Sequence, residues 1–228
     1  ASIFNKVKKA LIIDGFSLAF RAFYGLPVIM KGPDDRPINM VFGFINTLFK
    51  YIDTHAPDYV VVCFDTKDAT FRKEMYPDYK AHRSPPPDEF SEQVPKLKSS
   101  LESCGIGILE KPGFEADDLL GTLSMSNETI ACILATGDQD AYQLVTERTS
   151  VLANKKGVDV IITPTELKEK YGLTPNKIID LKALQGDTSD NIPGVTGVGE
   201  KTALKLLQEY GSLEEVYSNI DKITSKSL

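Results

Sequence analysis

The sequence predicts an α/β fold in which helices flank a mostly parallel sheet. Short apolar runs alternate with segments of helical periodicity over the first two thirds of the chain, as in a sheet whose parallel strands are joined by helices. One run, Val60–Phe64, is uniformly apolar, which predicts a strand covered on both faces. After about Thr163 the pattern changes to helices joined by turns rich in glycine and proline, which predicts a small helical subdomain.

The expected elements follow one another in that alternating order. Strands are predicted at Ala10–Ile13, Tyr59–Phe64, Ile106–Leu109 and Ile130–Ala135, with a further pair around Ser150–Asn154 and Val158–Ile162. Helices are predicted at Ser17–Tyr24, Val41–Thr54, Ser91–Ser103, Ala116–Ser124, Thr163–Tyr171, Pro175–Leu184 and Glu200–Tyr210. The chain is therefore expected to divide into an α/β core at residues 1–165 and a helical subdomain at residues 166–228.

Residues 66–90 depart from this alternation, because they are charged, aromatic and interrupted by proline. No apolar stripe here is strong enough to form core, so the segment is expected to be a mobile surface excursion of the kind that often carries function. Arg72, Tyr79 and Arg83 would share one helical face, but Pro77 favours a helix that begins only near it. Basic and aromatic side chains together suit a nucleic-acid strand, and a solvated charged loop is the alternative.

The charge balance leaves a nucleic-acid partner open. The chain has 26 lysines and arginines against 32 acidic residues, a net charge of −6, and nucleic-acid binders are usually basic. Many of the acids are clustered as candidate metal ligands, however, and the remainder is mildly basic. Cys63, Cys104 and Cys132 lack the spacing of a metal site and are expected to be buried thiols. No signal peptide or membrane-spanning apolar run is present, so a cytoplasmic protein without a membrane partner is expected.

Nine clustered carboxylates are the most informative feature of the chain. They are Asp14 and Asp65 after two strands, Glu115, Asp117 and Asp118 at a helix start, Asp138 and Asp140 after another strand, and Asp187 and Asp190 in a glycine-rich turn. The carboxyl ends of parallel strands form the ligand crevice of an α/β sheet. Carboxylates gathered there repel one another unless cations lie between them. Oxygen ligands suit Mg²⁺ or Mn²⁺, so the pattern predicts a divalent-metal phosphodiesterase site.

Each cluster alone has a simpler explanation. Acids in a first helical turn complement the helix dipole, which accounts for part of the Glu115–Asp118 group. In an extended segment Asp138 and Asp140 would project to one side and share an ion, but Asp138 would equally cap a helix over Ala141–Val145. Asp14 and Asp65 would serve as turn residues. Turn chemistry at all four clusters is a poorer explanation than one shared metal site.

The glycine-rich turn has the features of a phosphate-binding segment. Gly194, Gly197 and Gly199 let the backbone approach a ligand and adopt positive φ. Gly199 precedes the expected helix Glu200–Tyr210, whose free N–H groups favour a phosphate, with Lys201 nearby. A tight helix–helix connection is the alternative. The spacing excludes a nucleotide-binding P-loop.

These strings together resemble the 5′-nuclease (flap endonuclease) family, and within it the 5′→3′ exonuclease domain of bacterial DNA polymerase I. The matching strings include Leu-Ile-Ile-Asp-Gly at 11–15, Tyr-Lys-Ala-His-Arg at 79–83, Glu-Ala-Asp-Asp at 115–118, Thr-Gly-Asp-Gln-Asp at 136–140, Gly-Asp-Thr-Ser-Asp-Asn-Ile-Pro-Gly at 186–194 and Gly-Val-Gly-Glu-Lys-Thr-Ala at 197–203. They occur in family order over roughly residues 8–217. Gln139 departs from the family, which usually has lysine or arginine there.

The resemblance implies a PIN-like 5′-nuclease fold with a helical arch and a helix–three-turn–helix element that grips duplex DNA. It implies 5′→3′ exonuclease and flap endonuclease activity on DNA, and on RNA primers, in replication and repair. The substrates would be 5′ flaps, nicks and primer ends. Two Mg²⁺ or Mn²⁺ sites would be held by the nine carboxylates, and K⁺ would bind at the Gly194–Gly199 turn. A monomeric chain and a covalently attached polymerase domain are further expectations.

The resemblance also assigns roles to the basic and turn residues. Lys80 and Arg83 would be the catalytic cations that hold the scissile phosphate. The implied DNA contacts are Arg21, Arg72, Tyr79, Gly194, Gly197, Gly199, Lys201 and Thr202. Two alternatives compete with this interpretation. A PIN-type endoribonuclease shares the acidic sheet edge but lacks the glycine-rich turn, and a catalytically silent DNA-binding domain would have lost ligands that are all present here.

Overall fold

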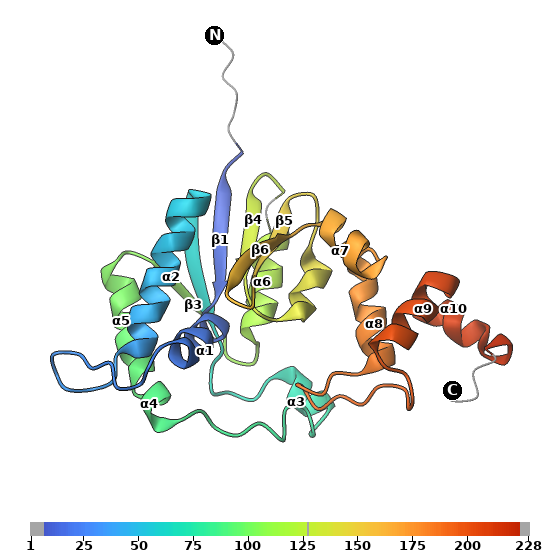
Figure 1. The fold of residues 1–228 in the computed structure, drawn as a ribbon, viewed down its shortest axis with the longest axis horizontal. Helices are drawn as coiled ribbons and strands as arrows, with labels where there is room; N and C mark the ends of the chain where they lie inside the picture. The colour runs from blue at the N-terminus through green and yellow to red at the C-terminus, as the bar shows by residue number, and fades with distance from the viewer. Residues whose placement is uncertain (1–6, 127, 224–228) are drawn as a thin grey trace, which may run out of the picture.

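The computed structural model describes residues 7–126 and 128–223 and shows helices on both faces of a central sheet, with further helices extending to one side (Figure 1). The described strands are β1 (Lys9–Asp14), β2 (Tyr59–Phe64), β3 (Gly107–Glu110), β4 (Ala131–Ala135), β5 (Thr149–Lys155) and β6 (Val158–Ile162). Their order in the sheet is β3-β2-β1-β4-β5-β6, and every neighbouring pair is parallel except β5 and β6. The predicted α/β class and mostly parallel sheet are confirmed.

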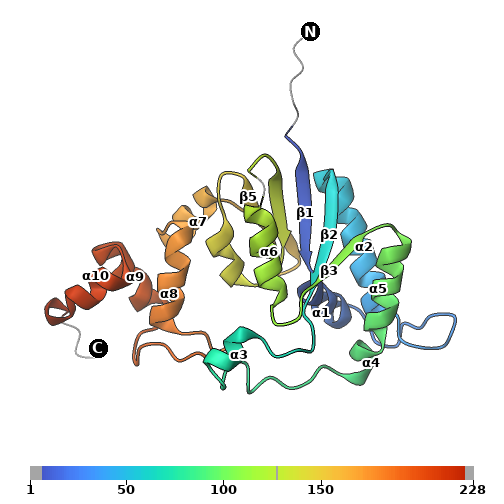
Figure 2. The same ribbon diagram turned by 180° about the vertical axis from the view of Figure 1, so that it is seen from behind.

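The central strand β1 divides the core into two layers. Leu11 and Ile13 pack in one apolar cluster with residues of α1 (Gly15–Gly25), α2 (Asn39–His55) and α5 (Gln93–Ser103). Ile12, between them, packs in a second cluster with residues of α6 (Ala116–Met125) on the opposite face. Figures 1 and 2 show these helices on the two sides of the sheet. Alternate residues of a strand face opposite ways, so a strand buried in both layers must be apolar throughout.

The C-terminal helices continue the second apolar cluster. They are α7 (Pro164–Tyr171), η2 (Pro175–Lys177), α8 (Ile178–Gln185), α9 (Glu200–Tyr210), α10 (Leu213–Ser218) and η3 (Ile220–Lys222). Leu167, Leu181 and Leu206 belong to the same cluster as Ile12 of the sheet. The helices therefore rest on the sheet layer through continuous apolar packing. The division at residue 165 stays a prediction, and its outermost residues, 1–6 and 224–228, lie outside the described ranges.

Several local expectations were wrong. In the excursion, α3 (Phe71–Met75) ends before Pro77, and turns follow where a helix was expected to begin. The excursion also contributes to the core, since Tyr79 is 7% exposed and Phe90, in α4 (Asp88–Ser91), is 1% exposed. The segment after β4 forms the 3-10 helix η1 (Gln139–Leu144), which begins two residues before the expected Ala141, and Asp138 caps it as the alternative explanation predicted.

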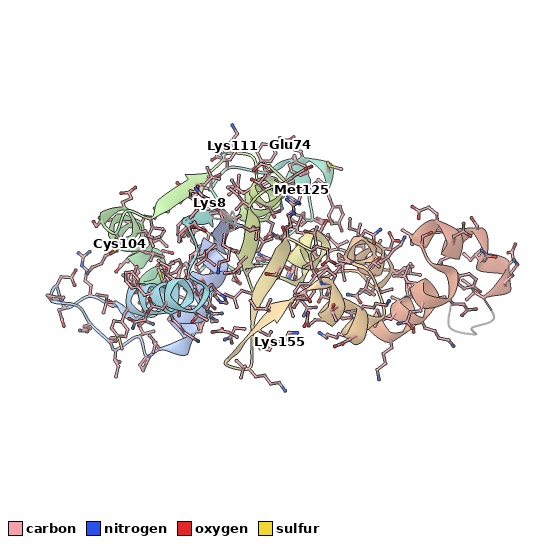
Figure 3. All side chains as sticks on the ribbon, turned by 90° about the horizontal axis from the view of Figure 1, so that it is seen from above. Lys8, Glu74, Cys104, Lys111, Met125 and Lys155 are labelled. Carbon is pink, nitrogen blue, oxygen red and sulfur yellow. The ribbon has the colours of Figure 1, made fainter. Side chains whose placement is uncertain are left out.

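Burial was also misjudged at two places. Cys104 is exposed because it ends α5 at the surface (Figure 3), whereas Cys63 and Cys132 are buried as predicted. The amino-terminal half of β2 is only partly covered, and burial is complete from Val62 onward. Within the described ranges, none of the helices combines the length and hydropathy needed to span a bilayer.

The turn after α8 depends on a close backbone approach at Gly194. A Cβ atom there would lie 2.3 Å from the carbonyl carbon of Gln185 and 2.4 Å from the nitrogen of Gly186, both backbone atoms. A Cβ atom at Gly199 would meet nothing within 4 Å, and the backbone there is extended, with φ −91°. Of these two glycines, only Gly194 is required by the fold.

We expect Gly194→Ala to lower the free energy of unfolding by about 1–3 kcal/mol, because backbone atoms must move to admit the methyl group. Gly199→Ala is the matched control and should change it by less than about 0.5 kcal/mol. Urea denaturation of both variants measures the difference. Equal free energies of unfolding for the two variants would show that the turn admits a methyl group at Gly194 without cost.

Candidate functional site

The candidate site lies where the carboxyl ends of β1, β2 and β4 meet the starts of α1, α6 and η1, at the lower edge of the sheet in Figure 1. A cavity of about 670 Å³ opens there. Its acidic lining consists of Asp14, Asp65, Glu115, Asp117 and Asp138. Its basic lining consists of Lys80, Arg83 and Lys182. The fold thus brings together five of the nine predicted ligands and both predicted catalytic cations.

Asp14 is held rigidly at the start of α1. It caps the helix by accepting a hydrogen bond from the Ser17 N–H at 3.1 Å, and it accepts another from the Thr136 hydroxyl at 2.9 Å. Burial of this carboxyl group raises its pKa to about 6, although both hydrogen bonds oppose the shift. Its role as a turn residue is therefore real, and it also presents a carboxylate to the cavity.

Asp65 and Asp117 come to the same place from β2 and α6. Asp65 accepts a hydrogen bond from the Ala116 N–H at 2.7 Å, which ties the end of β2 to the start of α6, and burial raises the pKa of Asp65. Asp117 Oδ1 is buried without a hydrogen-bond partner. Burial, and then the nearby charges of Asp14 and Asp138, raise the pKa of Asp117 to about 8.

This arrangement fits a hard divalent cation. A buried carboxylate oxygen without a donor is costly unless a cation binds it. The surrounding donors are carboxylate oxygens, the ligands that Mg²⁺ and Mn²⁺ prefer. A bound cation would favour the charged form of each carboxylate, opposing the burial that now disfavours it.

A second acidic group lies beside the first. Asp140, Asp187 and Asp190 each place one carboxylate oxygen within 4.8 Å of the others. The ammonium of Lys182 lies 2.9 Å from Asp140 and 2.6 Å from Asp187. Burial opposes ionisation of Asp187, but hydrogen bonds from Lys182 and Ser189 outweigh it and lower the pKa of Asp187 to about 2.

Lys182 is a site residue that the sequence did not reveal. It stands on α8, five positions before Asp187, in a helix that contains no other recognisable signal. That Asp138 and Asp140 share one ion stays a prediction, although the structure places the two carboxylates in different groups. Asp138 lines the first cavity and Asp140 belongs to the second group, because η1 turns the chain between them.

Of the three acids at the start of α6, Asp118 has a structural role. Asp118 accepts a hydrogen bond from the Glu115 N–H at 2.9 Å in a reciprocal capping box. It also pairs with both terminal nitrogens of Arg72, each at 2.8 Å. Burial opposes ionisation of Asp118, but these hydrogen bonds lower its pKa. Asp118 lies outside the lining of the first cavity, and Arg72, a predicted DNA contact, is occupied in holding it.

The excursion carries its cations over the cavity. Lys80 Nζ lies 3.0 Å from Glu115 Oε2, and Arg83 Nη2 lies 2.6 Å from Asp190 Oδ1. The Tyr79 hydroxyl lies within hydrogen-bonding distance of both carboxylates, 3.0 Å from Glu115 and 3.2 Å from Asp190, and its single proton is donated to one at a time. These residues occupy consecutive turns rather than the short helix expected for them. The Tyr79 side chain is buried, and its DNA contact stays a prediction.

The other predicted contacts lie away from the cavity. Arg21 projects from α1 toward α2, where its guanidinium donates to the Tyr51 hydroxyl at 2.8 Å. Of the turn glycines, Gly197 has φ 83° and requires glycine. Gly199 precedes α9 without a side-chain cap, so the first N–H groups of that helix remain open beside Lys201 and Thr202.

Two family models match consecutive parts of the chain. The N-terminal resolvase-like domain of 5′-3′ exonuclease matches residues 9–172, and the C-terminal SAM fold of 5′-3′ exonuclease matches residues 173–228. DNA polymerase I of Mycobacterium tuberculosis is 46% identical over 221 residues, which cover 95% of this chain and 24% of that protein. DNA polymerase I of Bacillus subtilis is 43% identical, with coverage of 97% and 26%. The chain thus spans about a quarter of the length of these relatives.

Solved structures show the same fold. A zinc-bound T5 5′-exonuclease matches with a TM-score of 0.73 at 24% identity, covering 95% of this chain and 79% of that one. A bacteriophage T5 flap endonuclease in a pseudo-enzyme–product complex with DNA and metal ions matches with a TM-score of 0.72 at 24% identity, covering 96% and 80%. The two family models together match residues 9–228, and this chain belongs to the 5′-3′ exonuclease family.

Proposed function

We propose that this chain is a divalent-metal-dependent 5′ nuclease, acting as a 5′→3′ exonuclease and flap endonuclease on DNA and on RNA primers in replication and repair. Its substrates would be 5′ flaps, nicks and primer ends. The observation that carries the proposal is the cavity itself, where Asp14, Asp65 and Asp117 face Lys80 and Arg83 across a space open to a phosphodiester. Membership of the 5′-3′ exonuclease family supports it.

Two metal sites follow from the two acidic groups. Asp14, Asp65, Glu115, Asp117 and Asp138 would hold one ion, and Asp140, Asp187 and Asp190 the other, with Asp118 acting on the first through Glu115. Bound Mg²⁺ or Mn²⁺ would supply an acidified water and neutralise charge on the phosphate. The proteins in the related T5 structures carry divalent metal ions, which supports this assignment.

The excursion cations would serve as the phosphate clamp. Lys80 and Arg83 now neutralise Glu115 and Asp190. Once those carboxylates are neutralised by other cations, both side chains are free to pair with phosphate oxygens, and a guanidinium does so in a bidentate manner. Charge that develops on the phosphate during attack would then be shared by two fixed cations.

The helical part of the chain would hold the duplex. The open N–H groups at the start of α9, with Lys201 and Thr202, suit a phosphate of the DNA backbone and carry no base specificity. The family resemblance supports a K⁺ ion at the Gly194–Gly199 turn and a monomeric chain. The match to only a quarter of DNA polymerase I supports a polymerase domain in a longer protein.

Cleavage of a labelled 5′-flap DNA tests the function. In Mg²⁺ we expect release of the flap, and in excess EDTA we expect none, because the carboxylates cannot position an attacking water without cations. Undiminished cleavage in EDTA would contradict the metal assignment. Absence of cleavage in both Mg²⁺ and Mn²⁺ would contradict the function.

Asp117 provides a test of the metal site that does not depend on activity. Its pKa is about 8 in the fold and 3.8 in the reference state, so the folded protein loses stability as pH rises between these values. In EDTA we therefore expect Asp117→Asn to melt several degrees above the wild type at pH 8, with little difference at pH 4. Added Mg²⁺ should raise the melting temperature of the wild type more than that of the variant. A variant that melts below the wild type at pH 8 would show that the carboxylate is needed for folding.

Lys80→Ala tests the phosphate clamp. Removing one preorganised cation should slow single-turnover flap cleavage by roughly 10²–10³-fold, while flap binding, spread over many phosphates, weakens far less. Lys67→Ala is the matched control, because Lys67 is an exposed lysine of the same excursion outside the cavity lining. Lys80 is partly buried and ion-paired, so its removal should also alter stability, whereas removal of the exposed Lys67 should not. Equal cleavage rates for both variants would support a solvated loop.

A further inference from the structure

The turn that carries Lys80 is bound to the helical part of the chain rather than free above the cavity. The strap, defined here as Asp187–Asn191, lies directly after α8, and the excursion turn, defined here as residues 78–83, lies beside it in both views (Figures 1 and 2). The Lys80 N–H donates to the Asp190 carbonyl at 2.9 Å, and the Asn191 side-chain amide donates to the Asp78 carbonyl at 2.8 Å. Arg83 Nε donates to the Ser189 carbonyl at 3.1 Å.

The backbone on both sides of this contact is in the left-handed region. Lys80 has φ 53° and Asn191 has φ 59°. Asparagine adopts this conformation more readily than most residues, whereas lysine rarely adopts it. Such a conformation persists in a non-glycine residue when its surroundings impose it. Two strap hydrogen bonds lie beside Lys80: Asn191 donates to the Asp78 carbonyl, which also accepts from the Ala81 N–H at 3.0 Å, and the Lys80 N–H donates to the Asp190 carbonyl.

The strap is itself a closed loop. Asp187 and Ile192 exchange backbone hydrogen bonds at 2.9 and 2.8 Å, and Asp187 Oδ1 accepts from the Ser189 N–H at 2.8 Å. It connects α8 to Gly194, which is packed against the backbone of Gln185. A loop closed in this way can support the excursion turn, whose internal hydrogen bonds are short-range and whose contacts outside the strap include those of Tyr79 and Lys80 with Glu115.

We propose that Asn191 is a positioning residue, and that the strap holds Lys80 in its left-handed conformation so that the ammonium group lies over the cavity. The strap then sets the orientation of the Lys80 ammonium. The same strap leads into the Gly194–Gly199 turn, which precedes the helix proposed to bind the duplex. The catalytic part of this inference rests on the proposed nuclease function, whereas the structural part does not.

Asn191→Gly distinguishes the effect of the side-chain amide from that of the backbone conformation. Glycine also adopts positive φ, so the side-chain contact that is lost is the hydrogen bond to the Asp78 carbonyl. In the metal-free protein we expect amide hydrogen exchange in residues 78–83 to speed up about threefold to tenfold, the scale of losing one hydrogen bond. With Mg²⁺ and flap DNA we expect the single-turnover rate to fall about tenfold to a hundredfold, the scale of a misplaced catalytic group. The dissociation constant for the flap should stay within about twofold, since the phosphate contacts remain.

Asn191→Asp is the second variant, because it tolerates the same backbone but turns a donor into an acceptor facing the Asp78 carbonyl, and it should reproduce both effects. Asn176→Gly is the control, since Asn176 is exposed and its side-chain oxygen accepts a hydrogen bond from the Thr174 hydroxyl, away from the strap. Unchanged exchange in residues 78–83 in both Asn191 variants would overturn the strap. Faster exchange with an unchanged cleavage rate would overturn the positioning role. A wild-type protein that does not cleave flaps refutes the proposed function, and the exchange measurement then still decides the strap.

Discussion

Electrostatic repulsion among carboxylates at one sheet edge is the constraint on which the rest of the site depends. Five of them line one cavity and three more form a neighbouring group. Burial, and then the charges of neighbouring carboxylates, raise the pKa of Asp14 to about 6 and that of Asp117 to about 8. The chain counters this with cations brought from outside the sheet: Lys182 from α8, and Arg72, Lys80 and Arg83 from the excursion.

This constraint explains why the excursion and the C-terminal helices converge on the same edge. Both segments add apolar residues to the two core clusters, Phe90 from the excursion and Leu181 from α8. Both supply positive charge to a group of acids that would otherwise be unpaired, and a buried ion pair broken on one side is strongly destabilising. The same pairs put the cations within reach of any anion that enters the cavity. Stability of the ligand-free fold and affinity for a phosphate thus draw on the same side chains.

The sequence predicted the parts of this arrangement that follow from local pattern. Strands β2 and β6 and helix α9 have the predicted bounds, because apolar runs between turn residues determine them. The acids at strand ends converge because parallel strands share one carboxyl edge. The burial of Tyr79 could not be predicted, since it depends on Asp190, more than a hundred positions away. The role of Lys182 could not be predicted either, since it stands on a helix with no local signal. The sequence also did not indicate that Arg21 donates a hydrogen bond to the Tyr51 hydroxyl of α2, and its DNA contact stays a prediction.

The apolar cluster that runs from Ile12 through Leu181 to Leu206 has a consequence for how the chain can be divided. The two family models meet between residues 172 and 173, yet both sides of that junction contribute to this single cluster. Tyr171 and Leu173, which flank it, are each 5% exposed or less. A truncation there would leave an apolar face of the sheet layer open to water. The separated helices would be too short to persist alone. The two sequence modules therefore share one apolar core in this protein.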